Sequence, residues 1–135
     1  MADQIHFQVV TADAAVFDRM TNYVGVPLTD GEAGILANHA AMLASLKSGV
    51  VKVKFEGGEE YIAVSGGVLS VSDNEVMILA RTAELAENID LARAKASEKR
   101  ARERLADKAH DFDMSRAEMS LARSLARQKA YSIHK

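Results

Sequence analysis

An acidic and a basic residue stand three positions apart in the hexad Ile89-Asp90-Leu91-Ala92-Arg93-Ala94. This spacing places a hydrogen-bond acceptor and a donor together at the start of a predicted helix. Asp90 also has a purely structural interpretation, because the helix dipole favours an acid in the first turn. The spacing alone does not decide between a ligand-binding role and a structural role.

Three arginines further along share one face of a second predicted helix, since Arg116, Arg123 and Arg127 are separated by seven and four positions. No acidic residue lies four positions before or after Arg123 or Arg127. Guanidinium groups without such partners suit a phosphate or an acidic partner surface. The alternative is a solvated helix with intrahelical ion pairs, of the kind expected between Glu98 and Arg102.

A polar segment between residues 29 and 46 offers a second set of candidates: Asp30, Glu32, Asn38 and His39. These side chains lie among small and apolar residues, where a turn presents them to solvent. They are therefore either contacts for a partner or ordinary solvating groups of a turn.

No enzyme signature is present in the chain. The four histidines, His6, His39, His110 and His134, are scattered without metal-ligand spacing, and His6 is expected on the solvent side of a strand. Gly-x-Ser-x-Gly and a phosphate-binding GxxxxGK[ST] loop are both missing. These absences predict a chain that is not an enzyme and that requires no cofactor.

Composition excludes several further classes. The net charge of −2 argues against nucleic-acid binding, although twelve of the 17 Lys and Arg residues follow Arg81. The chain has no cysteine and no apolar run of the roughly 20 residues that cross a bilayer. Its first residues have neither a basic nor an apolar region, so we do not expect them to form a signal peptide. We expect a soluble, cytoplasmic chain without direct membrane insertion, able to dock on a membrane complex.

The first 86 residues predict a β domain. Ile5, Phe7 and Val9 alternate with polar neighbours, and the segment from Val51 to Phe55 repeats the pattern. Turns are expected at Gly57-Gly58 and Asp73-Asn74, and a bulge or close backbone approach at Gly66-Gly67. Short strands at this spacing predict a β-sandwich or flattened barrel of about eight to ten strands.

Residues 87–135 predict two helices. The first is expected to begin at Asn88 as N-cap and to run to about Lys108, and the second to begin with a capping box from Ser115 to Glu118. The apolar stripes are narrow and rich in alanine: Ile89, Ala92, Ala96, Ala101 and Leu105 on the first, and Met114, Ala117, Leu121 and Leu125 on the second. Such contacts bury little apolar area, so the hairpin is a candidate moving part.

Three blocks of sequence resemble one family when taken together. The first block is Val26-Pro27 with Asp30-Gly31-Glu32-Ala33-Gly34-Ile35-Leu36, His39-Ala40, Leu43 and Leu46-Lys47-Ser48-Gly49. The second is Val64-Ser65-Gly66-Gly67-Val68-Leu69-Ser70-Val71 with Asn74 and Val76-Met77-Ile78-Leu79-Ala80. The third is Ala83-Glu84 with Ile89-Asp90 and Arg93-Ala94. In order and distance they are similar to the epsilon subunit of bacterial F-type ATP synthases, and the resemblance covers the whole chain.

The resemblance implies a ten-stranded N-terminal β-sandwich and a C-terminal two-helix antiparallel hairpin. It implies a peripheral place on the cytoplasmic face of the cell inner membrane, in a rotor stalk that couples rotation to the catalytic head. The gamma subunit and the c-subunit ring would be partners, with Asp30, Glu32, Asn38 and His39 as ring contacts. Relatives commonly have two prolines around this histidine. Here the segment reads Ala37-Asn38-His39-Ala40-Ala41, which predicts a looser loop.

The resemblance also implies regulation by the hairpin, which inhibits ATP hydrolysis when it extends into the catalytic head. Arg116, Arg123 and Arg127 would then meet an acidic segment of the beta subunit. Some members bind ATP in the folded-down state, as a regulator and not as a substrate. The matching residues here are Glu84, Ile89, Asp90, Arg93, Ala94, Arg123 and Arg127. The competing hypothesis is a free-standing nucleotide-sensing adaptor module.

Overall fold

The computed structural model describes residues 4–106 and 114–134 of the chain. Ten strands come first and the helices follow. The elements are β1 (Ile5–Val10), β2 (Ala15–Thr21), β3 (Tyr23–Leu28), β4 (Gly31–Ile35), β5 (Met42–Leu46), β6 (Gly49–Phe55), β7 (Gly58–Val64), β8 (Gly67–Ser72), β9 (Glu75–Ala80), β10 (Ala83–Leu85), the 3₁₀ turn η1 (Ala86–Asn88), α1 (Leu91–Ala106) and α2 (Met114–His134).

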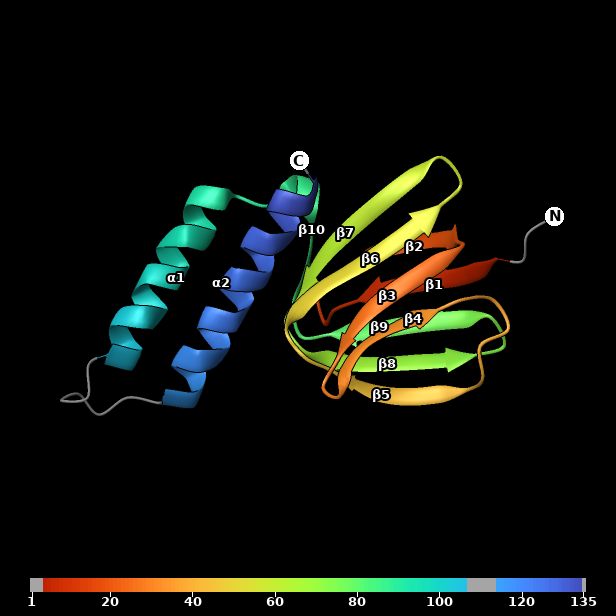
Figure 1. Ribbon diagram of the computed structural model, residues 1–135, viewed down its shortest axis with the longest axis horizontal. Helices are drawn as coiled ribbons and strands as arrows, with labels where there is room; N and C mark the ends of the chain where they lie inside the picture. The colour runs from red at the N-terminus through yellow and green to blue at the C-terminus, as the bar shows by residue number, and fades with distance from the viewer. Residues whose placement is uncertain (1–3, 107–113, 135) are drawn as a thin grey trace.

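The strands form one continuous sheet that is folded into two layers (Figure 1). Its order is β10-β7-β6-β3-β5-β8-β9-β1-β2, and β4 pairs with β3 outside this path. The sheet passes from one layer to the other at β3, which pairs with β6 along its first half and with β5 only at Leu28. The predicted ten-stranded β-sandwich followed by a two-helix hairpin is confirmed.

The space between the layers is filled by the alternating apolar residues that the sequence indicates. Ile5, Phe7 and Val9 of β1 are buried, as are Val51 and Val53 of β6. Successive side chains of a strand point to opposite faces of the sheet, so every second residue faces the space between the two layers. Both strands therefore contribute one apolar face to a common core. The core therefore depends on large aliphatic and aromatic groups.

The predicted turns form where glycine and asparagine permit positive φ. Gly57 joins β6 to β7 at φ 100°, while Asp73 and Asn74 join β8 to β9 at φ 49° and 61°. Gly67 has φ 135°, and a Cβ built there would lie 2.3 Å from the carbonyl oxygen of Leu79. The close backbone approach predicted at this position is confirmed, and no larger residue fits without a shift of the strands.

The helices begin at different residues from those predicted. Asn88 closes η1, and α1 starts only at Leu91, because Ile89 stays extended and packs into the body of the protein. α2 starts at Met114, so Ser115 lies inside the helix instead of capping it. Lys108, the predicted end of the first helix, lies outside the described residues.

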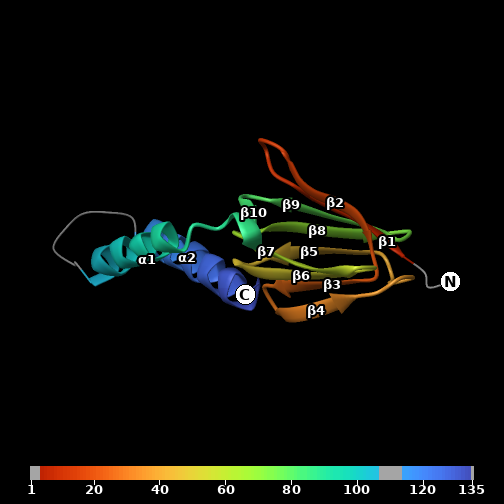
Figure 2. The same ribbon diagram turned by 90° about the horizontal axis from the view of Figure 1, so that it is seen from above.

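The hairpin lies beside one end of the sandwich, with α1 packed on α2 and α2 next to β6 and β7 (Figures 1 and 2). The buried positions of α1 are Ala94 and Ala101, while the predicted stripe residues Ala92 and Ala96 are exposed. The prediction was wrong here because it counted from Ile89, which precedes the helix. Two alanines seven positions apart leave room for close contact between the helices.

Candidate functional site

Three of the predicted nucleotide residues meet in a cleft between the hairpin and the sandwich. Glu84 comes from β10, the short edge strand next to β7, and Arg123 and Arg127 come from α2. Arg127 Nε lies 3.3 Å from Glu84 Oε1. The remaining walls come from β7 and its neighbours, including Ser65 and Thr82, whose hydroxyls are hydrogen-bonded to each other.

The cleft is small in this state, about 80 Å³. Sites for drug-sized ligands usually have about 300–1,000 Å³, so this volume admits a few water molecules and no nucleotide. A nucleotide could enter only if the Glu84–Arg127 pair separated. The geometry is therefore that of a closed cleft with one acidic and two basic groups at its mouth.

The ion pair corrects the prediction that Arg127 has no acidic partner. The prediction considered only residues four positions before or after the arginine, which lie on the same helix, whereas Glu84 belongs to the sandwich. Arg123 has no hydrogen-bond or ion-pair partner within the described part of the chain, although it lines the same cleft. Arg116 is exposed and lies two turns closer to the start of α2, away from this cleft.

The hexad from Ile89 to Ala94 is divided between packing and capping. Asp90 is the N-cap of α1: its Oδ1 accepts from the backbone N–H of Arg93 at 3.0 Å, and its carbonyl accepts from Ala94 N–H at 3.0 Å. Such a cap stabilises a helix by about 1 kcal/mol. Ile89 and Ala94 are buried, and the Arg93 side chain is exposed. The cap belongs to Asp90 and not to Asn88, since the helix begins two residues later than predicted.

The structure separates the four predicted ring-contact residues. Asp30 borders a shallow hollow with Leu43 and Val68, whereas Glu32 lines a different cavity with Lys129 of α2. Asn38 and His39 lie past the other end of β4, beside the β8–β9 turn. These four residues therefore do not form one surface patch.

The segment around Asn38 is fixed by side-chain amides in place of prolines. The backbone N–H of Asn38 donates to Asn74 Oδ1 at 2.6 Å, and Asn74 Nδ2 donates to Asn38 Oδ1 at 3.4 Å. His39 Nδ1 donates to the carbonyl of Ala40 at 2.7 Å, which leaves Nε2 as the acceptor of the neutral ring. The predicted looseness is thus opposed by bonds to a second turn.

An apolar surface that sequence reasoning missed covers the outer face of β5, β8 and β9. It consists of Leu43, Val68, Met77 and Leu79, which are 76%, 43%, 43% and 55% exposed. Strand pairing places Val68 directly opposite Leu79. The signal in the sequence is that the segment from Val76 to Leu79 is apolar on both faces of the strand. We call these four residues the apolar face, since contiguous exposed apolar groups usually mark an interaction site.

His6 lies on the outer face of β1, as predicted, and is held there between two carboxylates. Its Nε2 lies 2.6 Å from Asp18 Oδ1 and its Nδ1 lies 2.8 Å from Glu75 Oε2. These hydrogen bonds, the one to Asp18 first, raise the pKa of His6 above its ordinary 6.5. The bond from His6 in turn lowers the pKa of Asp18. The three residues tie β1 to both of its neighbouring strands.

Comparison with known proteins places these features in one class. Residues 4–86 match the beta-sandwich domain of the ATP synthase Delta/Epsilon chain, and residues 87–132 match its long alpha-helix domain. The chain therefore belongs to the ATP synthase delta/epsilon chain family. Its epsilon chains are non-catalytic subunits of the complex, so the prediction that the chain is not itself an enzyme is confirmed.

Relatives from several bacteria cover nearly the whole chain. The ATP synthase epsilon chain of Nitratidesulfovibrio vulgaris is 40% identical over 129 residues, covering 96% of each chain. That of Bacillus licheniformis is 44% identical over 119 residues, covering 88% of this chain and 91% of its own. The suggested resemblance is confirmed at the level of the whole sequence.

Solved structures share the fold. A chain of the Euglena gracilis mitochondrial ATP synthase OSCP/F1/c-ring assembly aligns with a TM-score of 0.81 at 23% identity, covering 94% of this chain and 81% of its own. A chain of the Tetrahymena thermophila central stalk and c-ring aligns at 0.56 and 14% identity, covering 98% and 97%. Among the described residues, no helix is long and apolar enough to span a bilayer.

Proposed function

We propose that the chain is a central-stalk subunit that couples rotation of the membrane ring to the catalytic head and restrains ATP hydrolysis through its hairpin. The observation that carries this proposal is the weak attachment of the hairpin to the sandwich. The buried cluster between them consists of Ala63, Ala86, Ile89 and Ala130, and the larger side chains that pack against it, Val50, Tyr61 and Tyr131, are only partly buried. Contacts of this size separate two states by only a few kcal/mol, as a switch requires.

Charge distribution supports a reversible attachment. Residues 1–90 hold 13 of the 19 acidic residues, and residues 91–135 hold 12 of the 17 basic ones. The Glu84–Arg127 pair is the place where these opposite charges meet most closely within the described residues. Opposite charges attract the hairpin to the sandwich, and the same basic side chains become available to another acidic surface when it leaves.

The apolar face is the surface we assign to the gamma subunit. It lies on the outer side of β5, β8 and β9, while the hairpin packs next to β6 and β7. The two surfaces are separate, so gamma can stay bound whichever position the hairpin takes. The large exposed side chain of Leu43 is the anchor such an interface needs.

For the c-subunit ring we propose contact through the amide-fixed loop that holds Asn38 and His39. Its bonds to Asn74 hold the loop in one shape. Asp30 and Glu32 would join this contact only if ring loops also reached the opposite end of β4. With these proposed partners, the chain would lie peripherally at the cytoplasmic face of the inner membrane.

The extended hairpin would meet an acidic segment of the beta subunit through Arg116, Arg123 and Arg127. In the docked state, ATP would act as a regulator at the cleft, with the arginines on its phosphates and Asp90 near the adenine amino group. Entry of ATP requires opening of the Glu84–Arg127 pair, because the cleft holds only about 80 Å³. No bond is made or broken in ATP at such a site.

The decisive experiment uses Arg123→Ala in a reconstituted catalytic head, with ATP hydrolysis as the readout. Arg123 has no polar partner in the docked state among the described residues, so its removal leaves the protein's own docking contacts intact and removes a proposed contact of the extended state. Loss of its proposed contact with ATP would favour the extended state and increase inhibition, so it acts in the opposite direction. We expect clear relief of inhibition. Arg104→Ala, an exposed arginine at the end of α1, is the matched control.

The double variant Arg123→Ala with Arg127→Ala extends the test to ligand binding. Arg127 also holds Glu84, so this variant loosens docking and weakens the contact with beta at once. NMR titration of the isolated chain should show weaker shifts with ATP for the double variant than for the wild type, with ADP as the comparison. Unchanged inhibition by both arginine variants would contradict a role for these side chains in the head.

A gamma-binding assay separates this function from the free-standing adaptor. Leu43→Ser and Leu79→Lys should abolish co-purification with gamma, whereas Leu36→Lys, which lies outside the apolar face, should not. An adaptor has no reason to bind a rotor subunit, so failure of the wild type to co-purify with gamma would favour that alternative.

A further inference from the structure

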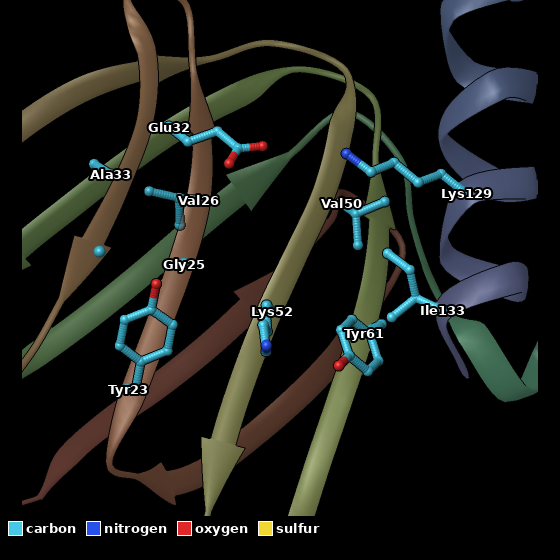
Figure 3. Close-up of a pocket in the computed structure, with 11 residues that line it drawn as sticks. Tyr23, Gly25, Val26, Glu32, Ala33, Val50, Lys52, Tyr61, Lys129 and Ile133 are labelled. Atoms are coloured by element: carbon cyan, nitrogen blue, oxygen red, sulfur yellow. The ribbon is translucent and has the colours of Figure 1, made fainter. Parts of the chain in front are cut away.

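A second cavity lies between the last turns of α2 and the outer face of β3, β4, β6 and β7 (Figure 3). Its volume is about 370 Å³, within the range of small-molecule sites. It is distinct from the cleft of Glu84 and the two arginines, with which it shares no lining residue. Its principal walls are Tyr23, Glu32, Lys52, Tyr61, Lys129 and Ile133.

Glycines shape one side of this cavity. Gly25 of β3 and Gly34 of β4 are paired across the two strands, and the ring of Tyr23 lies against both. A Cβ at either glycine would stand 3.0 Å from Tyr23 Oη. The absence of these side chains lets the aromatic ring lie flat on the sheet, where it can serve as a wall for a planar group.

Three charged side chains line the cavity, and one of them, Lys52, also lies near the Glu59 carboxylate, whose pKa is lowered by the hydrogen bond from Tyr61 and further by Lys52. Within the described part of the chain, Glu32, Lys52 and Lys129 make no hydrogen bond or ion pair. Figure 3 shows Lys129 extending from α2 toward the strand region where the Glu32 carboxylate points back at it. Lys52 Nζ lies 5.9 Å from the centre of the Tyr61 ring. The lining thus combines two cations, one anion and two aromatic rings.

Charged side chains that only interact with solvent would not need a concave surface with aromatic walls. A concave space with aromatic walls and a few convergent polar groups is the usual form of a small-molecule site. The surplus of one positive charge favours a monoanion, and the Tyr rings favour a planar one. The Glu32 carboxylate can accept from an N–H or O–H group of the same ligand.

We propose that this cavity binds a small aromatic carboxylate that bears a hydrogen-bond donor on its ring. The carboxylate accepts from Lys129, and Lys52 adds positive charge at the Tyr61 end of the cavity. The ring lies against the tyrosines, and the donor group reaches Glu32. Lys129 and Ile133 belong to α2, whereas the other lining residues belong to the sandwich. The ligand therefore holds the hairpin in its docked position by touching both parts.

The stabilisation of the docked hairpin by the ligand rests on the proposed mobility of the hairpin, whereas binding of the ligand to the cavity does not. Binding is measured on the isolated full-length chain, without gamma or a catalytic head. A failure to bind leaves the stalk function untouched, and a failure of inhibition leaves the titration untouched. The two proposals can therefore fail separately.

The test is an NMR titration of the full-length chain with para-hydroxybenzoate, and with methyl para-hydroxybenzoate as the uncharged comparison. We expect saturable shifts at Tyr23, Tyr61 and Ile133, with a dissociation constant on the order of 1 mM, typical of a fragment-sized ligand. The ester should bind at least several-fold more weakly. Hydrogen exchange of the last turns of α2 should slow when the carboxylate is bound.

Lys129→Gln keeps a flexible polar side chain, one atom shorter, and removes its charge, so it should weaken binding about tenfold, the usual effect of losing one charge-assisted hydrogen bond. Lys99→Gln, an exposed lysine of α1 outside the cavity, is the matched control and should bind like the wild type. Unchanged dispersion of the spectra shows that both variants fold. The proposal is overturned by the absence of saturable shifts, by equal binding in Lys129→Gln, or by shifts that map to the Arg123–Arg127 cleft.

Discussion

The sandwich and the hairpin of this chain bury different kinds of residue. The largest fully buried side chains, including Phe7, Ile35, Ile62 and Leu69, all belong to the sandwich. The buried residues of the described helices are alanines together with Ser124. Each large core side chain contributes about 1.5–3 kcal/mol on burial, whereas an alanine methyl contributes a fraction of that. The sandwich is therefore a cohesive body, and the hairpin is a loosely attached arm.

Alanine contacts suit an arm that must leave and return. An alanine loses no side-chain rotamer freedom when it is buried, so it gains none when it is released. The polar contacts of the arm are equally modest: Gln128 Nε2 donates to Glu98 Oε1 at 2.7 Å within the hairpin, and Arg81 Nη1 lies 3.9 Å from Met119 Sδ at the sandwich. The comparison indicates that large buried side chains hold the sandwich together, whereas small buried side chains leave the hairpin weakly attached.

The largest expected effect follows from truncation in the sandwich. Phe7→Ala removes a ring that is 0% exposed and packs against Phe17, with ring centres 5.7 Å apart. We expect the free energy of unfolding to fall by about 3–5 kcal/mol, as measured by urea denaturation. Met119→Ala in the hairpin should cost far less. Comparable losses for the two variants would remove the distinction between body and arm.

An intermediate effect is expected where the arm meets the body. Ala130 is 0% exposed and belongs to the cluster of Ala63, Ala86 and Ile89. Ala130→Leu adds three carbons to a site without room and should weaken docking by about 1–3 kcal/mol. Hydrogen exchange should accelerate in α2 while the strands keep their protection. The control is Ala92→Leu on the exposed side of α1, which should leave exchange unchanged.

A smaller effect belongs to the ion pair that joins the two regions. The side chains of Arg127 and Glu84 are 29% and 37% exposed, so their attraction is partly screened. A double-mutant cycle with Glu84→Gln and Arg127→Gln should give a coupling free energy of about 0.5–1 kcal/mol at low salt. The coupling should shrink in high salt. A coupling that is insensitive to salt would mean that the pair acts by packing and not by charge.

Much of the sandwich could be predicted from sequence because its pattern is local. Alternation along β1 and β6 specifies which side chains face inward, and the turns at Gly57 and Asp73 depend on residues within two or three positions. The start of α1 could not be predicted in the same way. Asn88 and Asp90 are both good caps, and the choice was made by Ile89, which is held extended by packing against distant alanines.

The candidate site was harder to predict than the fold because it depends on contacts between distant segments. The partner of Arg127 lies 43 positions earlier in the chain, where no helical periodicity would find it. The apolar face was hidden because Met77 and Leu79 alternate with buried residues that are also apolar. His6 and Glu75 are 69 positions apart in the sequence, and only the parallel pairing of β1 with β9 brings them together.

The smallest effect concerns this His6 arrangement, and it should be confined to the body. The hydrogen bonds to Asp18 and Glu75 raise the pKa of His6 above 6.5, so the folded protein holds the proton more tightly than the unfolded chain. This contribution to stability is fully present below pH 6.5 and is lost as the pH rises through the folded-state pKa. Asp18 has a lowered pKa, so its contribution is present above pH 3.8 and is lost as the pH falls through its folded-state value.

Replacing His6 by Asn should therefore lower the melting temperature most at mildly acidic pH, between these two limits. The difference from the wild type should diminish as the pH rises through the folded-state pKa of His6, because neutral imidazole can donate only one of the two hydrogen bonds. Hydrogen exchange in α2 should not respond, since β1, β2 and β9 make no extensive contact with the helices among the described residues. A melting-temperature difference that stays constant with pH would show that His6 acts by shape alone. A response in α2 would show that the body and the arm are coupled through the strands.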